Sequence, residues 1–503
     1  MRRAAVLVAL AVAVIAAGCG GDSDEASRPP VTKAIEALPN FVIVLSDDQS
    51  QASFNRRVMP RTFALLDDGG TSFPNSVVSS NLCCPARAGI LTGDYPHNTG
   101  VVNNHPGYPE LTQPESILPA WLQATGYRTG MVGKFMNGYD DLEAAPGFDY
   151  WQDVIGNPAY YDYKLSDNGE VEKFGDEPHD YLTRVLTGRA DDFMQRASGR
   201  RPFFLWLSYY SPHLAKSNGD GRCGGGAPTP DPRDLGAFAG SGPPPTPSFN
   251  ERRIGDKRPK IAEQPLLTPS EVRQDTLNLS CSKAAMRGVD RGIGQLAGTL
   301  RRAGELDNTM IVYMADNGTF YGEHRIFKGK GDPYEEGIHV PMLARIPNGV
   351  LGQNPVPEVR APVANIDVAP TMAQLARTKP CTADDDCRLV DGRSFVPLLE
   401  GAGAKSAEDR AVLLQVGPGC NGYDGIRTTR YTYVKYRGDP TAGGGCTIES
   451  RELFDLQRDP FELQSVLARP AARARYRATI ADLDRRLNEL KDCQGTSGAK
   501  ACE

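Results

Sequence analysis

The fold class of this chain is decided by the segment Pro39-Asn40-Phe41-Val42-Ile43-Val44-Leu45-Ser46-Asp47-Asp48-Gln49. Five apolar residues in a row, bounded by turn-forming and acidic residues, are typical of a strand buried on both faces of a parallel sheet. Three similar runs follow, Tyr127 to Val132, Phe203 to Tyr210 and Met310 to Met314. Because helical patterns separate them, we predict an α/β fold with helices on both sides of the sheet.

The clearest helical pattern lies before the last of these runs. Its apolar residues recur at spacings of three and four, which places them on one helix face: Met286, Val289, Ile293, Leu296 and Leu300. In sheets of this kind, binding and chemistry occur at the carboxyl ends of the strands. The residues directly after each apolar run are therefore the first candidates for a functional site.

Acidic and amide side chains follow two of the predicted strands. Asp47 and Asp48 come after the first, and Asp316 and Asn317 come after the fourth. Two adjacent acids repel each other unless a cation compensates them, and oxygen ligands suit a hard divalent ion such as Ca²⁺ or Mg²⁺. One Asp-Asp pair could simply start a turn, but two such sites in one sheet favour a shared metal ion.

Composition narrows the class of partner. The chain has 503 residues, with 56 Lys and Arg against 62 Asp and Glu, a net charge of −6. This balance argues against a polybasic nucleic-acid binder, so we expect no nucleic-acid partner. The length allows about three domains, or one large α/β domain with a smaller one.

The N-terminus predicts export. Met1-Arg2-Arg3 precedes an apolar run over 4–17 and then Gly18-Cys19, which reads as a signal peptide over 1–18. The ending resembles that of bacterial lipoproteins, so we predict that Cys19 carries lipid and anchors the protein at the outer face of a bacterial cell membrane. The alternative is a secreted protein with an incidental Cys19. A polar, flexible tether would occupy 19–37.

The rest of the chain divides into two predicted parts, a catalytic domain over 38–404 and a smaller C-terminal subdomain over 405–503. Lys216 to Pro247 is rich in Gly and Pro and lacks apolar periodicity, so residues 216–247 are predicted to be a surface insertion. The subdomain is expected to contain short antiparallel strands and a terminal helix, at Ala411 to Val416, Tyr431 to Tyr436 and Ala471 to Leu490.

The most specific motif is Asn81-Leu82-Cys83-Cys84-Pro85-Ala86-Arg87-Ala88-Gly89-Ile90-Leu91-Thr92-Gly93. It resembles the signature of the sulfatase family, in which the cysteine is converted after synthesis to formylglycine, an aldehyde. The match places this residue at Cys83. Without the surrounding motif, Cys83 would be read as a disulfide partner or a buried thiol.

Further elements occur in the order of that family. They are Gly133-Lys134, Ser211-Pro212-His213, Lys330 with Tyr334-Glu335, and Glu452-Leu453-Phe454-Asp455-Leu456 with Asp459-Pro460-Phe461-Glu462. The resemblance implies an alkaline-phosphatase-like fold: a large, mainly parallel sheet between helices, with a smaller C-terminal antiparallel sheet and a terminal helix. It implies Ca²⁺ rather than Mg²⁺, with ligands Asp47, Asp48, residue 83, Asp316 and Asn317.

The resemblance also implies catalytic roles. Arg87, Lys134 and Lys330 would neutralise the sulfate, and His213 would donate a proton to the departing alcohol. Our hypothesis is that one hydroxyl of the hydrated aldehyde attacks sulfur, and that loss of the second hydroxyl's proton then releases sulfate. Many arylsulfatases carry a histidine where this chain has Met136, so the base of the second step is unassigned. His97 and His324 are candidates.

Leu82-Cys83-Cys84-Pro85 and Tyr95-Pro96-His97-Asn98 look most like the N-acetylglucosamine-6-sulfatase branch. A small sulfated amino sugar is therefore the expected substrate, and a formylglycine-generating maturation enzyme is the expected partner. Three alternatives stay open: a general arylsulfatase, a phosphate or phosphonate ester hydrolase of the same superfamily, and a non-catalytic binding protein on this fold.

The chain has eleven cysteines, an odd number. If Cys19 carries lipid, Cys83 becomes the aldehyde and Cys84 is a buried thiol, eight remain. Eight cysteines allow 105 connectivities. From proximity alone we expect sequential pairing: Cys223–Cys281, Cys381–Cys387, Cys420–Cys446 and Cys493–Cys502.

Overall fold

The computed structural model describes residues 38–215, 223–402, 407–442 and 444–502. The predicted signal peptide, the lipid site at Cys19 and the tether lie outside the described residues. So do the first residues of the predicted insertion, 216–222, and the predicted domain boundary at 404 and 405. None of the described helices is long and apolar enough to cross a membrane.

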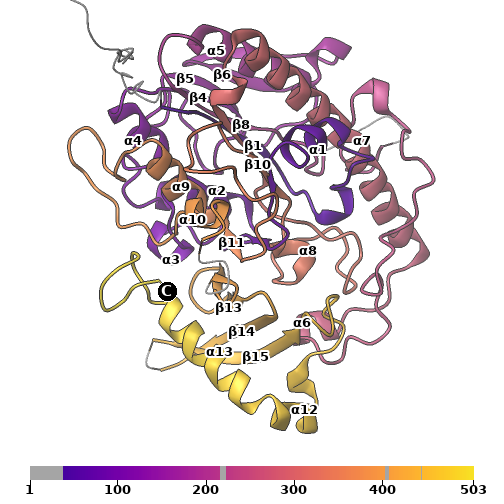
Figure 1. The fold of residues 1–503 in the computed structure, drawn as a ribbon. Coiled ribbons are helices and arrows are strands. Elements are labelled where there is room, and N and C mark those ends of the chain that lie inside the picture. The colour runs from indigo at the N-terminus through magenta and orange to yellow at the C-terminus, as the bar shows by residue number, and fades with distance from the viewer. Residues whose placement is uncertain (1–37, 216–222, 403–406, 443, 503) are drawn as a thin grey trace, which may run out of the picture. The chain divides into compact units, whose positions relative to one another are not determined.

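A nine-stranded sheet forms the centre of the fold (Figure 1). Strands β9, β1, β8, β4 and β5 run parallel, whereas β10, β6 and β7 continue the sheet through antiparallel pairs. The order across the sheet is β2 (Thr71–Ser72), β10 (Met342–Arg345), β9 (Thr309–Ala315), β1 (Asn40–Ser46), β8 (Phe203–Ser208), β4 (Arg128–Gly133), β5 (Tyr150–Val154), β6 (Lys164–Asp167) and β7 (Glu170–Lys173). The predicted mixed, mainly parallel sheet is confirmed.

Strand β1 is buried throughout and sends its side chains into two separate cores. Phe41, Ile43 and Leu45 pack in the core that contains α2, α4 and α9. Val42 and Val44 pack in the core that contains α1, α5 and α7. Because successive side chains of a strand point to opposite faces, the unbroken apolar run indicates that both faces of the sheet are buried at β1.

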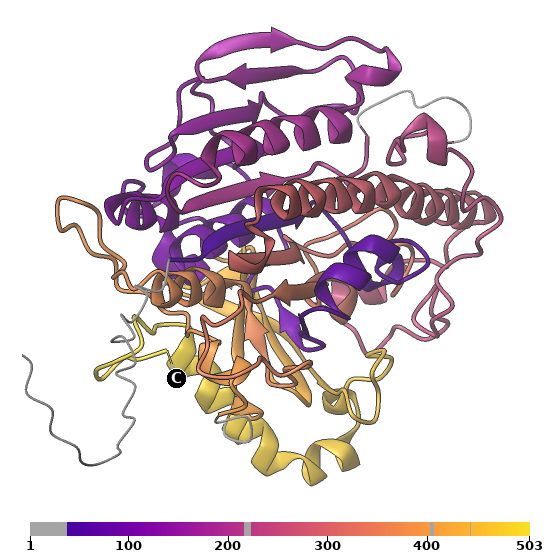
Figure 2. The same cartoon turned by 45° about the horizontal axis from the view of Figure 1, so that its top comes forward.

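Helices cover both faces of the sheet. One side carries α2 (Cys83–Thr92), α4 (Leu118–Ala124) and α9 (Val368–Leu375), and the other carries α1 (Pro60–Leu66), α5 (Leu182–Ala197) and α7 (Pro269–Ala303). Figure 2 shows the long helix α7 running beside α5. Helix α7 begins at a capping box formed by Thr268 and Glu271. It contains the predicted apolar face from Met286 to Leu300, buried as expected.

Shorter elements connect these layers. They are α3 (Pro96–Thr99), α6 (Pro259–Ala262), α8 (Glu335–Ile338), α10 (Val396–Leu399) and a two-stranded parallel sheet of β3 (Ser76–Val77) and β11 (Val363–Ala364).

The C-terminal part forms a four-stranded antiparallel sheet, which confirms the second sheet of the prediction. Its strands are β12 (Val412–Val416), β13 (Gly422–Arg427), β14 (Tyr431–Pro440) and β15 (Cys446–Asp455). The predicted single helix from Ala471 to Leu490 is instead two helices, α12 (Pro470–Arg475) and α13 (Arg477–Leu490). They are separated at Tyr476, whose hydroxyl donates to Asp455 at 2.7 Å.

All four predicted disulfides are present: Cys223–Cys281, Cys381–Cys387, Cys420–Cys446 and Cys493–Cys502. Cys83 and Cys84 are buried and outside these pairs. The first disulfide ties the described part of the insertion to α7, and Asp234 of the insertion accepts hydrogen bonds from Arg287 and Arg291 of the same helix.

Candidate active site

The carboxyl ends of β1 and β9 bring the first predicted site residues together. The two strands pair in parallel with Ser46 opposite Ala315, so Asp47 and Asp316 emerge side by side. The Asp316 amide donates to the Ser46 carbonyl at 3.0 Å. The strand register alone therefore joins two acids that are far apart in the sequence.

The turn after β1 directs Asp48 toward the same point. Asp48 has φ 63°, in the left-handed region, which disfavours most side chains but is tolerated by Asp and Asn. Its amide donates to Asp316 Oδ1 at 3.2 Å, and its carboxylate accepts a bond of 2.6 Å from Asn317 Nδ2. Both predicted pairs thus lie in one hydrogen-bonded group.

Helix α2 adds Cys83 and Arg87, one turn apart on the same helix face. Cys83 Sγ lies 3.4 Å from Asp47 Oδ1. The fully buried guanidinium of Arg87 donates to Asp316 at 2.8 Å and to Asp47 at 3.1 Å. Arg87 thus holds two acids in place, and its remaining bonds are to the Lys134 and Phe135 carbonyls and to Ser208 Oγ. Its predicted contact with the sulfate stays a prediction.

Lys134 enters from the end of β4. The preceding Gly133 has φ 111°, and a Cβ there would lie 1.9 Å from the Ser208 carbonyl oxygen, so the close approach of β4 and β8 requires glycine. Lys134 Nζ donates to Asp47 at 2.6 Å.

Lys330 and His213 complete the group. Lys330 Nζ lies 2.5 Å from Asp48 Oδ1 and 2.7 Å from Cys83 Sγ. His213 Nδ1 lies 2.8 Å from the Leu214 carbonyl oxygen, so Nδ1 carries a hydrogen and donates it. Nε2 lies 3.5 Å from Asp48 Oδ2. Every residue of the predicted site set is therefore in one connected group of contacts, which we call the Cys83 cluster.

The carboxylates of the Cys83 cluster are buried, and their pKa values diverge. Burial alone would raise the pKa of Asp47, but the charge of Lys134 and its neighbouring cations holds it well below its usual range. At Asp48, burial also acts to raise the pKa, but the charge of Lys330 outweighs it and lowers the pKa. Burial and the charge of Asp47 raise the pKa of Asp316. Built-in cations thus keep two of the three acids ionised.

The two proton-exchanging groups of the Cys83 cluster are also shifted. Burial, followed by the charge of Asp47, raises the pKa of the Cys83 thiol. The unmodified thiol is therefore protonated at neutral pH and a poor nucleophile. Burial lowers the pKa of His213 against the opposing effect of Asp48.

The donor set fits a hard divalent cation. Ligand atoms of Asp47, Asp48, Cys83 and Asp316 all lie within 4.8 Å of one another. Asn317 is fully buried, and within the described residues its Oδ1 has no hydrogen-bond partner, although its Nδ2 donates to two acceptors. A buried amide oxygen without a donor, beside three carboxylates, is what an oxygen-ligated ion would satisfy.

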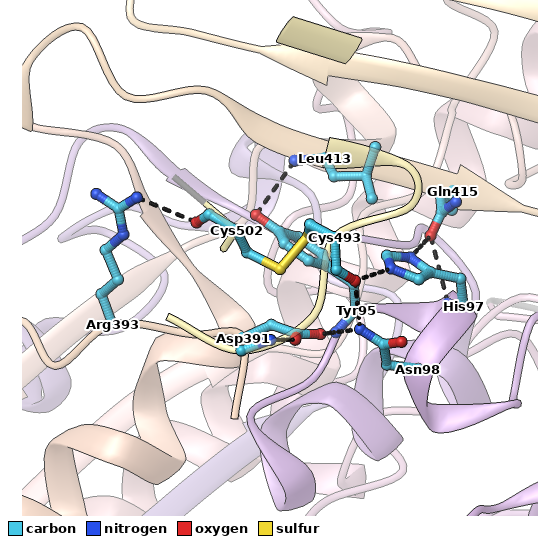
Figure 3. Close-up of a disulfide and its surroundings, with 10 residues drawn as sticks. Tyr95, His97, Asn98, Asp391, Arg393, Leu413, Gln415, Cys493 and Cys502 are labelled. Carbon is cyan, nitrogen blue, oxygen red and sulfur yellow. Dashed lines mark hydrogen bonds between the residues drawn. A yellow bond between two sulfur atoms is a disulfide. The ribbon is translucent and has the colours of Figure 1, made fainter. Parts of the chain in front are cut away.

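The two histidines considered for the second step lie elsewhere. His97, on α3, contacts Gln415 Oε1 at 2.7 Å through Nδ1 and the Cys493 carbonyl at 2.9 Å through Nε2. Figure 3 shows this ring holding the chain end beside the Cys493–Cys502 disulfide. His324 pairs with Glu251 and Glu336. Within the described residues neither ring bonds to the Cys83 cluster, so the base stays unassigned.

Three supporting residues were missed by the sequence analysis. Asn365 accepts from the Ser79 amide and donates to the Ala86 carbonyl, which fixes α2. Asn104 Oδ1 accepts from the Cys84 amide at 2.9 Å, in the first turn of that helix. Ser208 Oγ accepts from Arg87 at 2.8 Å. No local pattern marks Asn365. Asn104 belongs to Val101-Val102-Asn103-Asn104, which continues the family resemblance seen at Tyr95-Pro96-His97-Asn98, and Ser208 lies at the end of a predicted strand, so both had a usable signal.

Comparison with known proteins identifies the family. The model described as Sulfatase matches residues 39–378, and the model described as N-sulphoglucosamine sulphohydrolase, C-terminal, matches residues 322–493. The Homo sapiens N-acetylglucosamine-6-sulfatase is 32% identical over 380 residues, which are 72% of this chain and 65% of that protein. An extracellular sulfatase homolog from Drosophila melanogaster is 31% identical over 73% of this chain. The matched part makes up only 32% of the length of that relative.

A solved structure in complex with D-glucosamine-2-N,6-O-disulfate shares the fold. Its TM-score is 0.72 at 23% identity, and the match covers 90% of this chain and 97% of that one. The fold, the position of Cys83 at the start of α2 and the match to the family model over most of the chain agree, and this chain belongs to the sulfatase family.

Proposed function

We propose that this protein hydrolyses sulfate monoesters at the Cys83 cluster. The single observation that carries the proposal is the position of Cys83. Its Sγ lies at the start of α2, in contact with an acid of the cation site, Asp47, and with Lys330. A nucleophile for an anionic substrate has to work next to positive charge, and this arrangement supplies it.

The chain's own residues divide the remaining work. Residue 83, as the formylglycine that the family implies, would supply the attacking hydroxyl of a hydrated aldehyde. Lys134 and Lys330 would hold the sulfate oxygens by charge, because each already presents its ammonium group to a carboxylate of the site. In its doubly protonated form, His213 would give the Nε2 proton to the departing alcohol and keep the Nδ1 hydrogen that bonds to the Leu214 carbonyl.

We propose that the cation is Ca²⁺, held by Asp47, Asp48, Asp316 and Asn317 with residue 83. When bound, it would polarise the sulfate and favour ionisation of the nucleophile. Four oxygen-bearing side chains are the donor set that Ca²⁺ prefers, and Mg²⁺ is the less favoured alternative. Removal of the ion by a chelator should abolish turnover, and Ca²⁺ should restore it better than Mg²⁺.

The proposed substrate is a sulfated amino sugar. Its support is the similarity to proteins named N-acetylglucosamine-6-sulfatase and to the fold of a structure that binds a disulfated glucosamine. Four disulfides indicate an oxidising compartment, so we propose that the protein is exported. A lipid anchor at Cys19 and activation by a formylglycine-generating enzyme remain part of this proposal.

The chain offers a matched pair of variants for the test. Cys83→Ala should lose sulfatase turnover by a factor of about 10⁴ or more, because the nucleophile is gone. Cys84→Ala removes the neighbouring buried thiol and should keep turnover within about tenfold. A mass spectrum of the peptide that contains residue 83 should show formylglycine in active protein. Full activity with an intact thiol would overturn the proposal.

A substrate panel tests the ester class. We expect turnover of N-acetylglucosamine 6-sulfate to exceed that of an aryl sulfate, and both to exceed turnover of phosphate and phosphonate monoesters. Preference for a phosphonate ester would favour the alternative hydrolase of the same superfamily. Equal turnover of aryl and sugar sulfates would favour a general arylsulfatase.

A further inference from the structure

A second group of buried ionisable side chains lies outside the Cys83 cluster. It joins His324, in the segment after β9, to Glu336 of α8 and to Glu462 in the segment after β15. One ring nitrogen of His324 and one carboxylate oxygen from each glutamate all lie within 4.8 Å of one another, and His324 Nε2 lies 3.5 Å from Glu336 Oε2. We call these three residues with their neighbours Glu251, Glu323 and Lys257 the His324 cluster.

In each of the three residues, one polar atom is already bound by the protein. His324 Nδ1 lies 3.0 Å from Glu251 Oε2. Glu336 Oε1 accepts from Ser248 Oγ at 2.9 Å, and Glu462 Oε2 accepts from the Glu335 amide at 2.8 Å. These bonds hold the three side chains in place and leave His324 Nε2, Glu336 Oε2 and Glu462 Oε1 as the remaining polar atoms.

The second atoms are left without adequate partners. Among the described residues, His324 Nε2 and Glu462 Oε1 make no hydrogen bond, although both residues are fully buried. The approach of His324 Nε2 to Glu336 Oε2 is 3.5 Å. An unpartnered buried acceptor costs about 1–3 kcal/mol, so two of them in one group of neighbouring side chains indicate a missing partner that would satisfy both.

From this geometry we propose that His324, Glu336 and Glu462 bind a divalent transition-metal ion, with Zn²⁺ as the best fit, at a site separate from the Cys83 cluster. One imidazole nitrogen and two carboxylate oxygens are a ligand set that Zn²⁺ accepts. Zn–N and Zn–O distances of about 2.0–2.2 Å place tetrahedral ligand atoms about 3.4 Å apart. The 3.5 Å between His324 Nε2 and Glu336 Oε2 matches that spacing.

Two further features support the site. A histidine that binds metal through one nitrogen commonly donates from the other to a carboxylate, which is the relation of His324 Nδ1 to Glu251. The cluster also contains more acid than base, with four glutamates against Lys257 and His324.

The site would have a structural consequence. Glu336 lies close in sequence to Lys330, and Glu462 belongs to the C-terminal part of the chain. An ion held by both would fasten the segment that carries a catalytic lysine to the C-terminal segment. The competing arrangement is a proton on His324 Nε2, which would pair with Glu336 and exclude the ion.

Metal counting in the full-length protein separates the two arrangements. Four proteins are dialysed against Zn²⁺ at pH 8 and analysed by mass spectrometry for bound metal: wild type, Asp48→Asn, Glu462→Gln and the double variant. Asp48→Asn weakens the Cys83 cluster, and Glu462→Gln removes one ligand charge with little change of shape. We expect Glu462→Gln to hold one Zn²⁺ fewer than wild type, and the double variant one fewer than Asp48→Asn.

A neighbouring glutamate provides the matched control. The Glu323 carboxylate accepts from the Tyr321 amide at 2.6 Å and is outside the set of three ligands, so Glu323→Gln should keep the wild-type count. Zinc-edge absorption spectra of Asp48→Asn should show nitrogen and oxygen ligands and no sulfur. Equal zinc counts in wild type and Glu462→Gln would overturn the proposal, as would a sulfur ligand. Should Glu462→Gln fail to fold, His324→Gln replaces it with the same expectation.

Discussion

The Cys83 cluster and the His324 cluster are both buried and both rich in acid, but their charges are balanced differently. Asp47, Asp48 and Asp316 face three cations of the chain, Arg87, Lys134 and Lys330. Among the described residues, the ion pairs of the four glutamates of the His324 cluster are with Lys257 and His324. Similar burial and similar residue types therefore produce one balanced group and one with surplus negative charge.

This difference in charge balance suits the two clusters to different roles. In the Cys83 cluster the cations come from different segments and sit beside the nucleophile, an arrangement suited to an anionic substrate. In the His324 cluster the surplus carboxylates have no such partners, which calls for a proton or a metal ion. The predictions below test this comparison, from the largest expected effect to the smallest.

Breaking the balance of the Cys83 cluster should have the largest effect. Arg87→Gln leaves Asp47 and Asp316 buried without their guanidinium partner, so we expect a loss of about 3–5 kcal/mol in the free energy of unfolding, measured by urea denaturation. The control is Arg388→Gln, which removes a buried partner of Asp94 far from the nucleophile. It should destabilise similarly and leave the folded enzyme active. Unchanged stability of Arg87→Gln would contradict the ion-pair account.

Removing a cation that is proposed to bind the sulfate should reduce turnover. We expect Lys330→Gln to lower kcat/KM about 10²- to 10³-fold, because it removes charge stabilisation beside residue 83. Lys328→Gln is the matched control, since Lys328 is a half-buried lysine of the same segment whose Nζ contacts the Gly225 carbonyl. Equal losses in the two variants would show that the effect comes from the segment and not from the ammonium group.

The pH dependence of stability should report on the His324 cluster. Burial lowers the pKa of His324, but Glu336 and Glu251 more than reverse this and raise it to about 10. A folded-state pKa above the ordinary 6.5 means that the stabilisation is present below pH 6.5 and is lost as the pH rises through 10. In chelator-treated protein, the free energy of unfolding should fall by about 3 kcal/mol between pH 6.5 and pH 9.

Two comparisons sharpen that measurement. The slope should become shallower in His324→Gln, where only the raised pKa values of Glu323 and Glu462 still contribute. It should also shrink in the zinc-loaded wild type, where the ion takes the place of the proton. A slope that is the same with and without Zn²⁺ would favour the protonated histidine and count against the second metal site.

The smallest effect is expected outside both clusters. His97 bonds to Gln415 and to the Cys493 carbonyl, so His97→Gln should cost about 1 kcal/mol of stability through lost hydrogen bonds. Turnover should stay within about twofold, measured with the same sulfate ester. A large loss of turnover would mean that the chain end influences the Cys83 cluster.

The sequence predicted the residues that follow long apolar strands or share a helix face. Asp47 and Asp316 meet because β1 and β9 pair in register, and Arg87 follows Cys83 by one helical turn. By contrast, Asn365 and Asn104 reach α2 from loops without periodicity.

The His324 cluster could not be predicted for a related reason. Glu336 and Glu462 are brought together only by long-range packing between α8 and the segment after β15. The break between α12 and α13 was also missed, because no helix-breaking residue marks it in the sequence. At the break, Tyr476 makes a tertiary contact with Asp455. Local sequence patterns predict strands and helix faces, whereas contacts between residues far apart in the sequence depend on how the loops fold.

The burial of Cys83 bears on when this residue could be modified, before or after the chain folds. Its side chain is 1% exposed, its Sγ is covered by Lys330, and the next amide is bonded to Asn104. If residue 83 is converted to formylglycine as proposed, the converting enzyme has to contact a side chain that the folded protein covers. We therefore expect the conversion to precede the packing of α2 against the sheet, so that a chain that folds first keeps its thiol.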